Sequence, residues 1–352
     1  MRLNARPAGH DAGPPNLLVI LGATASGKTR LGVELARACC GEIISADSRQ
    51  VYRGMDIGTG KDLHEYGGIP YHLIDIAPPG SEFNLFQFQR LFFEAFAGIS
   101  GRGRLPVLVG GSGMYLDCVL RGYQLSEVPE NPELRLELAP LDMEQLAERL
   151  ARANPRLHNS TDLTERARLV RAIEIAECSS AKSGDQSSVA TGGAEVSATR
   201  DTESSTGCSA GGRACDEPDG SRPNLSAVTL GIRWDRAELR KRITERLRAR
   251  LEAGMIEEVE QLHASGIPYQ QLEFYGLEYR FLARHLKGEL SRNDMFQKLN
   301  SAIHDFAKKQ ENWFRRMESH GTPIHWLEGA GDPLREALDY LAGPPARFRV
   351  AP

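Results

Sequence analysis

The stretch Leu17–Thr29, LLVILGATASGKT, is the strongest indication of the fold class. Its first five residues are apolar and are typical of a buried strand. Its last eight fit the phosphate-loop pattern GxxxxGK[ST], which needs a strand before it and a helix after it, here predicted over Gly27–Ala38. Glycines let such a loop turn its backbone N–H groups toward a phosphate, and the helix N-terminus adds partial positive charge.

Two side chains at the end of this loop complete a predicted phosphate site. Lys28 can reach an outer phosphate oxygen, and the hydroxyl of Thr29 can bind Mg²⁺. The loop alone leaves open whether the phosphates belong to a nucleotide that is cleaved or to another diphosphate.

The rest of the chain continues this alternation of apolar runs and helical periods. Helices are predicted at Phe86–Ile99 and Asp235–Ala253. Short strands are predicted at Glu42–Ser45, Tyr71–Ile76, Pro106–Val109 and Ala227–Ile232. Short strands separated by helices indicate an α/β fold, here a P-loop NTPase-like parallel sheet flanked by helices.

Changes in composition predict the domain organisation. Residues 16–124 and 225–330 form the predicted core, and residues 125–178 an all-helical insertion domain with helices at Glu133–Leu138, Met143–Ala153 and Leu163–Ala176. Residues 179–224 are predicted to be disordered, because Ser179–Pro223 contains no Leu, Ile, Phe, Trp or Tyr to bury. Flexible tails are predicted at residues 1–15 and 331–352.

Composition limits the class of protein. The 352 residues carry a net charge of −4, which argues against a strongly basic nucleic-acid binder but leaves room for a local basic patch. No stretch approaches the roughly 20 apolar residues of a bilayer span, so we expect no membrane association. The six cysteines lack the spacing of a disulfide framework or a zinc site. We expect a monomer in the cytoplasm.

Polar residues follow two of the predicted strands. Asp47 follows the second strand, and the C-terminal ends of parallel strands form the ligand crevice, so Asp47 should face the phosphate loop. It could act as a general base, hold a metal through water, or only cap a turn. The strand ending at Val109 runs into the double glycine Gly110–Gly111 and then Ser112. A kinase-like ATPase would place a metal-binding Asp there, so this pattern weakens the case for ATP hydrolysis.

A series of motifs is specific where each motif alone is not. The chain contains, in order, GATASGKT (22–29), ADSRQVYRGMDIGTGK (46–61), PYHLIDI (70–76) and LVGGSGMY (108–115). RLVRAIE (168–174), WDRAELRKRITER (234–246), LEAGMIEEV (251–259) and AKKQENWFRR (307–316) follow. Together they resemble the tRNA dimethylallyltransferase (tRNA isopentenyltransferase) family. The resemblance covers nearly the whole chain from Asn16 to about Arg316, apart from the segment expected to be disordered.

The resemblance implies a magnesium-dependent transfer of the dimethylallyl group from dimethylallyl diphosphate. The acceptor is the exocyclic N6 amine of the adenine on the 3′ side of the tRNA anticodon. It implies that Asp47 is the general base, that Lys28 and Ser112 assist catalysis, and that Thr29 binds Mg²⁺. Residues implied to bind the diphosphate are Gly22, Thr24, Ala25, Ser26, Gly27, Lys28, Thr29 and Arg246. Residues implied to contact the anticodon stem-loop are Asp47, Ser48, Arg49, Gln50, Ser112, Arg135, Arg168 and Arg171.

Basic stripes are the least specific part of this prediction. Arg242, Arg246 and Arg250 recur every four residues on one predicted helix, and such a stripe could be a solvated face.

Three functions other than tRNA prenylation stay open. They are a prenyltransferase of free adenine nucleotides, a P-loop small-molecule kinase, and an inactive RNA-binding relative of the enzyme.

Overall fold

The computed structural model describes residues 14–125, 127–153, 166–184 and 223–343. The described residues divide into two compact units, one within residues 1–123 and 221–352 and the other within residues 124–220. In the described part of the chain, no helix has both the length and the apolar character needed to cross a membrane.

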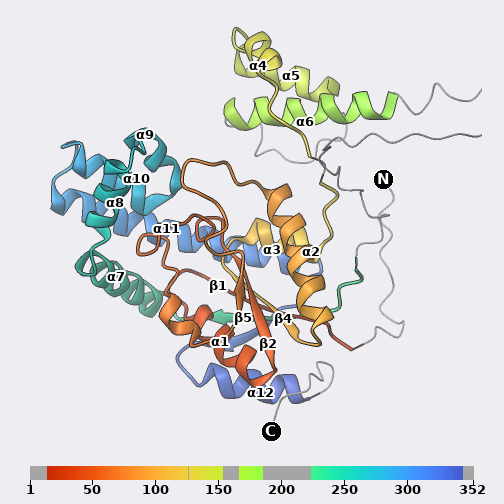
Figure 1. Cartoon of the computed structure of the whole chain (residues 1–352), viewed down its shortest axis with the longest axis vertical. Helices are drawn as coiled ribbons and strands as arrows, with labels where there is room; N and C mark the ends of the chain where they lie inside the picture. Colours follow the sequence, from red (N-terminus) through yellow and green to blue (C-terminus); the bar gives the residue numbers. More distant parts are fainter. Residues whose placement is uncertain (1–13, 126, 154–165, 185–222, 344–352) are drawn as a thin grey trace, which may run out of the picture. The chain divides into compact units, whose positions relative to one another are not determined.

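The larger unit is built on a six-stranded parallel sheet (Figure 1). Its strands are β1 (Leu17–Gly22), β2 (Gly41–Ala46), β3 (Tyr71–His72), β4 (Leu105–Gly110), β5 (Ala227–Arg233) and β6 (His325–Glu328). They lie in the order β3-β2-β4-β1-β5-β6, and every neighbouring pair is parallel. All six residues of β1 are buried, because helices cover both faces of the sheet.

Alternate residues of β1 face opposite helical layers. Leu18 and Ile20 pack with α1 (Lys28–Ala38) and α12 (Pro333–Ala342) on one face. The odd-numbered residues face the other layer, which contains α2 (Leu85–Gly101), α3 (Gly113–Leu120) and the end of α11 (Arg292–Ser319). Figure 1 shows α1 and α12 on one side of the strands and α2 and α3 on the other. The predicted α/β fold with a parallel sheet is confirmed.

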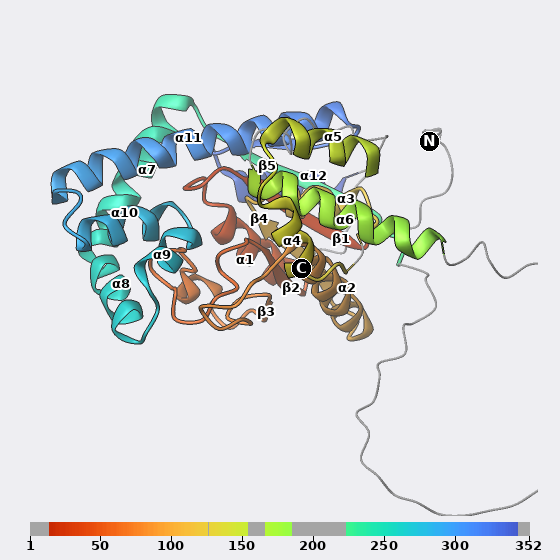
Figure 2. The same ribbon diagram turned by 90° about the horizontal axis from the view of Figure 1, so that it is seen from above.

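A separate apolar cluster of this unit joins a group of helices to the beginning of α11. The group comprises α7 (Arg236–Glu252), α8 (Met255–Ala264), α9 (Tyr269–Leu272), the 3₁₀ turn Glu273–Tyr275 and α10 (Leu277–Leu286). Tyr279 and Leu299 are buried in this cluster. Figure 2 shows α11 running from these helices to the sheet. One continuous 28-residue helix therefore links the helical cluster to the sheet.

Loop 53–61 is fixed to its surroundings by two charged side chains. The carboxylate of Glu258, on α8, accepts hydrogen bonds from three successive backbone N–H groups, at residues 56–58, over 2.7–3.0 Å. Lys61 is only 1% exposed, donates to the carbonyl of Tyr52 and forms ion pairs with Asp56 and Asp75. The loop is therefore held in one conformation beside the sheet.

The smaller unit is helical, with α4 (Pro132–Leu138), α5 (Met143–Ala153) and α6 (Arg166–Gly184). Aliphatic residues spaced along these helices form its core: Leu134, Leu138, Leu146, Leu150, Leu169 and Ile173. The helix α6 runs to residue 184, past residue 178, where the predicted insertion domain ends. The predicted helix start at Leu163 and residues 185–222, most of the segment predicted to be disordered, lie outside the described residues.

Three elements correct the prediction. The strand predicted at 71–76 ends at His72, because Leu73 and Asp75 adopt left-handed φ angles of 65° and 56°, which do not fit an extended chain. Strand β6 is absent from the prediction, since its four residues at the sheet edge include polar ones at both ends. Helix α12 occupies much of the predicted C-terminal tail. Of the two predicted tails, residues 1–13 and 344–352 lie outside the described residues.

The docking of α12 gives a stability prediction. Leu341 is 0% exposed and packs in the cluster on the α1 face of the sheet, so Leu341→Ala should lower the free energy of unfolding by about 2–4 kcal/mol. Urea unfolding measures this, with the exposed Arg335→Ala of the same helix as a control within about 0.5 kcal/mol of the parent. Equal, small effects of both changes would contradict a docked α12.

Candidate active site

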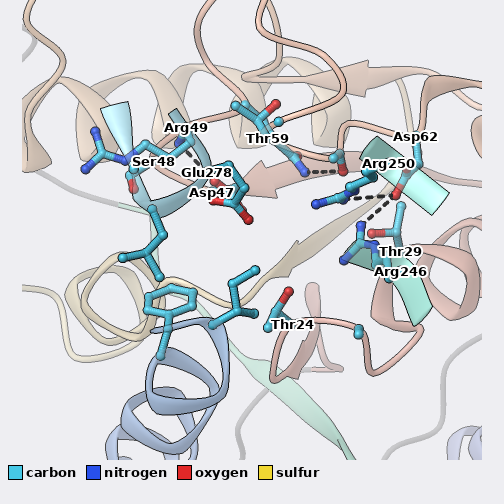
Figure 3. A pocket seen from close by; sticks show the side chains of 18 of the residues that line it. Thr24, Thr29, Asp47, Ser48, Arg49, Thr59, Asp62, Arg246, Arg250 and Glu278 are labelled. Atoms are coloured by element: carbon cyan, nitrogen blue, oxygen red, sulfur yellow. Dashed lines mark hydrogen bonds and ion pairs between the residues drawn. The ribbon is translucent and has the colours of Figure 1, made fainter. Parts of the chain in front are cut away.

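A cavity of about 810 Å³ lies in the larger unit, where β1, β2 and β4 end (Figure 3). The phosphate loop, residues 47–50 and Ser112 line it on the side of the sheet. Most of residues 58–65, helix α7, residues 274–280 and part of α11 line it from the helical side. The cavity therefore lies at the C-terminal edge of the parallel strands, where ligands bind in open α/β sheets.

The phosphate loop has the backbone geometry that its glycines predict. Gly27 has a φ of 90° and Ala25 a φ of 62°, so the chain reverses just before α1 begins at Lys28. Gly22 and Ser26 lie behind the cavity wall: a Cβ atom at Gly22 would come within 2.5 Å of the buried Ser26 hydroxyl. These two residues shape the loop. The loop residues that line the cavity, and can contact a ligand, are Thr24, Ala25, Gly27, Lys28 and Thr29.

Gln310 of α11 joins the phosphate loop to the loop after β4. Its Oε1 accepts a hydrogen bond from the backbone N–H of Thr24 at 2.9 Å, and its Nε2 donates to the carbonyl of Gly111 at 2.8 Å. The approach is close, since a Cβ atom at Gly111 would lie 2.5 Å from Nε2. No role for Gln310 is predicted from the sequence, because nothing in a local pattern shows a contact across 286 residues.

Lys28 is held in an unusual electrostatic environment. Its pKa is lowered to about 8, first by burial and then by the nearby Arg246 and Arg250, while Asp47 and Asp62 act in the opposite direction. Its Nζ donates to the carbonyl of Ala23 at 3.4 Å. Burial and neighbouring cations both disfavour the charged lysine, so a bound anion would raise its pKa again.

Asp47 lies on the cavity wall, where the sequence predicts it. One carboxylate oxygen, Oδ1, accepts a hydrogen bond from the backbone N–H of Arg49 at 2.9 Å, which fixes the side chain in a turn. Figure 3 shows Asp47 close to Glu278, away from Thr29, Arg246 and Arg250. Asp47 therefore both caps a turn and faces the cavity.

The residues after Asp47 differ in how they face the cavity. The backbone N–H of Ser48 donates to the Ser112 hydroxyl at 3.4 Å, so Ser112 lies next to the Asp47 segment. Arg49 lies with its guanidinium 6.0 Å from the ring centroid of Phe274.

Gln50 faces the protein more than the cavity. It is buried, accepts a hydrogen bond from the Ser45 hydroxyl at 2.9 Å and donates to the carbonyl of Gly60 at 3.1 Å. These bonds make Gln50 a support of the cavity wall, and the contact with tRNA that the resemblance implies for it stays a prediction.

The arginine stripe of α7 faces the cavity. Arg242 donates from Nε to the carbonyl of Ala25 at 3.0 Å and stacks on Trp234, with Cζ 4.0 Å from the ring centroid. Arg246 donates to Asp62 at 2.7 Å, and Arg250 lies 3.7 Å from the same carboxylate oxygen. The stripe is therefore a wall of the site.

Two acidic residues of the cavity have no predicted role from the sequence. Asp62 follows the loop 53–61; burial would raise its pKa, but Arg246 and Arg250 together outweigh this effect and the pKa is lowered. Burial raises the pKa of Glu278, with Arg250 opposing the change and Asp47 adding to it. Neither residue belongs to the series of motifs quoted above, and only the tertiary fold brings them to this cavity.

The position of Thr29 fits its predicted role as a magnesium ligand. It follows Lys28 in the first turn of α1 and lines the cavity. Mg²⁺ at phosphate sites usually takes one or two protein oxygens, with phosphate oxygens and water as its other ligands. Within residues 14–125, 127–153, 166–184 and 223–343, no group of three or more His, Cys, Asp or Glu side chains is arranged to hold a metal ion.

The predicted tRNA contacts of the smaller unit surround a buried carboxylate. Glu174 is 2% exposed and accepts hydrogen bonds from Arg135 at 2.7 Å and from Arg171 at 2.8 Å. Burial alone would raise the pKa of Glu174, but these bonds outweigh it and the pKa is lowered. Arg168 lies on the same helix, α6, as Arg171. Arg135 thus joins α4 to α6, and Arg171 joins α6 to the segment before α4 through the carbonyl of Val128. The role of these arginines toward tRNA stays a prediction.

The family model for IPP transferase matches residues 50–317, and a model for isopentenyl transferase matches residues 15–66. The chain belongs to the tRNA dimethylallyltransferase family. A tRNA dimethylallyltransferase of Citrifermentans bemidjiense is 67% identical over 93% of this chain and 95% of its own length. One from Geotalea uraniireducens is 64% identical, over 93% and 97%.

Solved structures support the same family. The tRNA isopentenylpyrophosphate transferase of Bacillus halodurans is 28% identical, with a TM-score of 0.62 over 93% of this chain and 96% of that one. A eukaryotic dimethylallyltransferase acting on tRNA, 20% identical, has a TM-score of 0.70 over 93% and 78% and shows the same fold. The resemblance seen in the sequence motifs is confirmed.

The bridge made by Gln310 gives a prediction for ligand binding. Gln310→Ala removes the acceptor of the Thr24 N–H and the donor to Gly111, so the phosphate loop should lose its fixed shape. We expect the affinity for inorganic diphosphate to fall about tenfold, in line with the loss of one to two buried hydrogen bonds. Isothermal titration measures it, with the exposed Gln297→Ala of the same helix as the control. Unchanged affinity in Gln310→Ala would contradict the role of the bridge.

The lowered pKa of Lys28 gives a pH prediction. Lys28 is cationic below a pH of about 8 and neutral above it, so the affinity for an anion should fall as the pH rises through this value. Lys28→Arg keeps its charge over this range, and comparison with it removes the titration of the ligand itself. Between about pH 7 and about pH 9, the loss of diphosphate affinity should be about tenfold greater in the parent. Parallel pH profiles would contradict a lowered pKa.

Proposed function

We propose that the protein transfers the dimethylallyl group of dimethylallyl diphosphate to the N6 amine of the adenine next to the tRNA anticodon, on its 3′ side. The observation that carries this proposal is that one cavity contains a carboxylate, Asp47, a phosphate loop that ends at Lys28, and Arg246 of α7. Such a site can receive a proton from an attacking amine at one end and stabilise a leaving diphosphate at the other. Membership of the family supports the same reaction.

The reaction has a simple electron balance. The nitrogen lone pair of the adenine amine forms a bond to C1 of the dimethylallyl group, and the C1–O bond breaks with its electrons going to diphosphate. The nitrogen then loses one proton, and Asp47 accepts it. An aromatic exocyclic amine is a weak nucleophile, so a carboxylate held in place by the Arg49 N–H assists it.

The leaving group needs charge stabilisation where the oxygen departs. Backbone N–H groups of the loop, Lys28 and Arg246 supply it in a partly desolvated cavity, where each interaction is stronger than in water. Mg²⁺ bound at Thr29 would neutralise part of the diphosphate charge. We infer that the protein uses this ion and acts as a monomer in the cytoplasm, where its tRNA substrate is found.

The loop after β4 bears on the kinase alternative. A Cβ atom at Gly110 would overlap the carbonyl oxygen of Ala46, and one at Gly111 would lie 2.5 Å from Gln310. No acidic side chain fits at either position, so the strand end lacks the carboxylate that holds the metal in many kinase-like sites. This favours transfer of an alkyl group over phosphoryl transfer.

The experiment that tests this proposal uses Asp47→Asn, which keeps the acceptor for the Arg49 N–H but is not basic. Protein, Mg²⁺ and dimethylallyl diphosphate are incubated with an anticodon stem-loop RNA or with AMP, and the nucleosides are analysed by mass spectrometry. We expect prenylated adenosine from the RNA, formed about 10²–10⁴-fold more slowly by the variant, while inorganic diphosphate still binds.

The two acceptors separate the alternatives. Product only from AMP would favour a prenyltransferase of free nucleotides. No product from either acceptor, with diphosphate binding intact, would favour an inactive RNA-binding relative.

A further inference from the structure

Arg246 and Arg250 lie side by side against the phosphate site. They are one turn apart on the same face of α7, and both line the cavity. Arg246 donates to Oδ2 of Asp62 at 2.7 Å, and Nη2 of Arg250 lies 3.7 Å from the same oxygen. Figure 3 shows both guanidinium groups converging on Asp62, next to Thr29. From the sequence, only Arg246 has a predicted role toward the ligand.

Arg250 is the more desolvated of the two cations. Its side chain is 14% exposed, against 32% for Arg246. Nη2 of Arg250 is buried and makes no hydrogen bond within the described residues. Burial and the neighbouring Arg246 lower the pKa of Arg250 to about 10, which still leaves it charged at neutral pH. A buried cationic donor with no acceptor is costly, so its presence in a cavity wall points to an anionic ligand.

Gly60 provides the space for these two guanidinium groups. A Cβ atom at Gly60 would overlap Nη2 of Arg250 and would lie 2.8 Å from Nη2 of Arg246. Gly60 also has a φ of 63°, and its carbonyl accepts a hydrogen bond from Gln50. The backbone of loop 53–61 therefore packs directly on the arginines and limits where they can lie.

In the described part of the chain, the cations at this end of the cavity outnumber the carboxylates that form ion pairs with them, and the buried Glu278 also acts on Arg250. Lys28, Arg246 and Arg250 lie close enough together that both arginines lower the pKa of Lys28. Asp62 is the carboxylate that pairs with the two arginines. A diphosphate offers more negative charge and more acceptor oxygens than one carboxylate, and it can bind both guanidinium groups at once.

We propose that Arg250 is a second diphosphate-binding arginine beside Arg246, and that Asp62 competes with the diphosphate for both guanidinium groups. This inference rests on the proposed function and deepens it, because diphosphate is the leaving group of that reaction. Asp62 then has a positioning role with a kinetic consequence. Asp62 keeps both guanidinium groups beside the phosphate loop before the diphosphate binds, and it pairs with them again as the product diphosphate departs.

Binding of inorganic diphosphate tests both parts without RNA or a prenyl donor. Arg250→Gln should weaken binding about tenfold or more, the effect expected on loss of a charge-assisted hydrogen bond. Asp62→Asn should strengthen it about tenfold, because the amide no longer competes as an anion. Arg248→Gln is the matched control, since Arg248 is exposed on the same helix with its guanidinium over Phe296. Titrations run with and without Mg²⁺.

Coupling between the two positions is the sharper criterion. If Asp62 acts by competing for the arginines, Asp62→Asn should strengthen binding less in an Arg250→Gln background than in the parent. Arg250→Lys retains a charge but lacks the planar guanidinium that can bind two oxygens at once, so its affinity should fall between those of the parent and Arg250→Gln. It also serves as the test if the glutamine variant does not fold. Parent-like affinity in both Arg250 variants would overturn the role of Arg250.

The competing role of Asp62 is tested by a separate result. Weaker or unchanged diphosphate binding in Asp62→Asn would show that the carboxylate orients the arginines or helps hold the metal, and does not compete. In turnover, Asp62→Asn should form prenylated RNA in an initial burst followed by a slower steady rate, because product release is delayed. A protein that binds diphosphate as expected but prenylates no RNA would refute the proposed function and leave the arginine pair intact.

Discussion

The contact on which the site depends is the side-chain amide of Gln310. It holds the backbone of Thr24 in the phosphate loop and the carbonyl of Gly111 after β4, and it comes from the helix that also spans the helical cluster. A phosphate loop binds through N–H groups that must converge on one point, so its affinity depends on its shape. Three segments far apart in the chain are thus fixed relative to one another by one buried side chain.

The electrostatic division of the cavity follows from this arrangement. Cations from α1 and α7 gather at the phosphate loop, while Asp47 lies away from Thr29, Arg246 and Arg250, with Glu278 between Asp47 and Arg250 in its electrostatic effects. The negative charge that develops on a leaving diphosphate therefore meets the positive potential of these cations. The proton released by an amine meets the negative potential of Asp47. Because the cavity is partly desolvated, these potentials act on the reacting groups with little screening.

The helical cluster supplies one wall of this cavity, and charged side chains connect it to the sheet. Glu258 binds three N–H groups of loop 53–61, and Tyr279 donates to the same carboxylate at 2.7 Å. Lys61 ties that loop to Asp75, just after β3 at the sheet edge. Loop 53–61 limits where the arginines of α7 lie and so keeps them at the phosphate site. The motif at residues 46–61 therefore contributes both to the fold and to ligand binding.

Local patterns are enough to predict the phosphate loop, the parallel sheet and the place of Asp47, because these depend on an apolar strand, glycines at a turn and a helix start. The roles of Gln310, Asp62, Arg250 and Glu278 emerge only in the folded chain, because each acts through partners far away in the sequence. The same holds for β6 and α12, since a polar edge strand and a short terminal helix carry weak local signals. Arg135 and Arg171 show the limit most clearly: the family resemblance implies only that they contact tRNA, and packing reveals the buried Glu174 that they share.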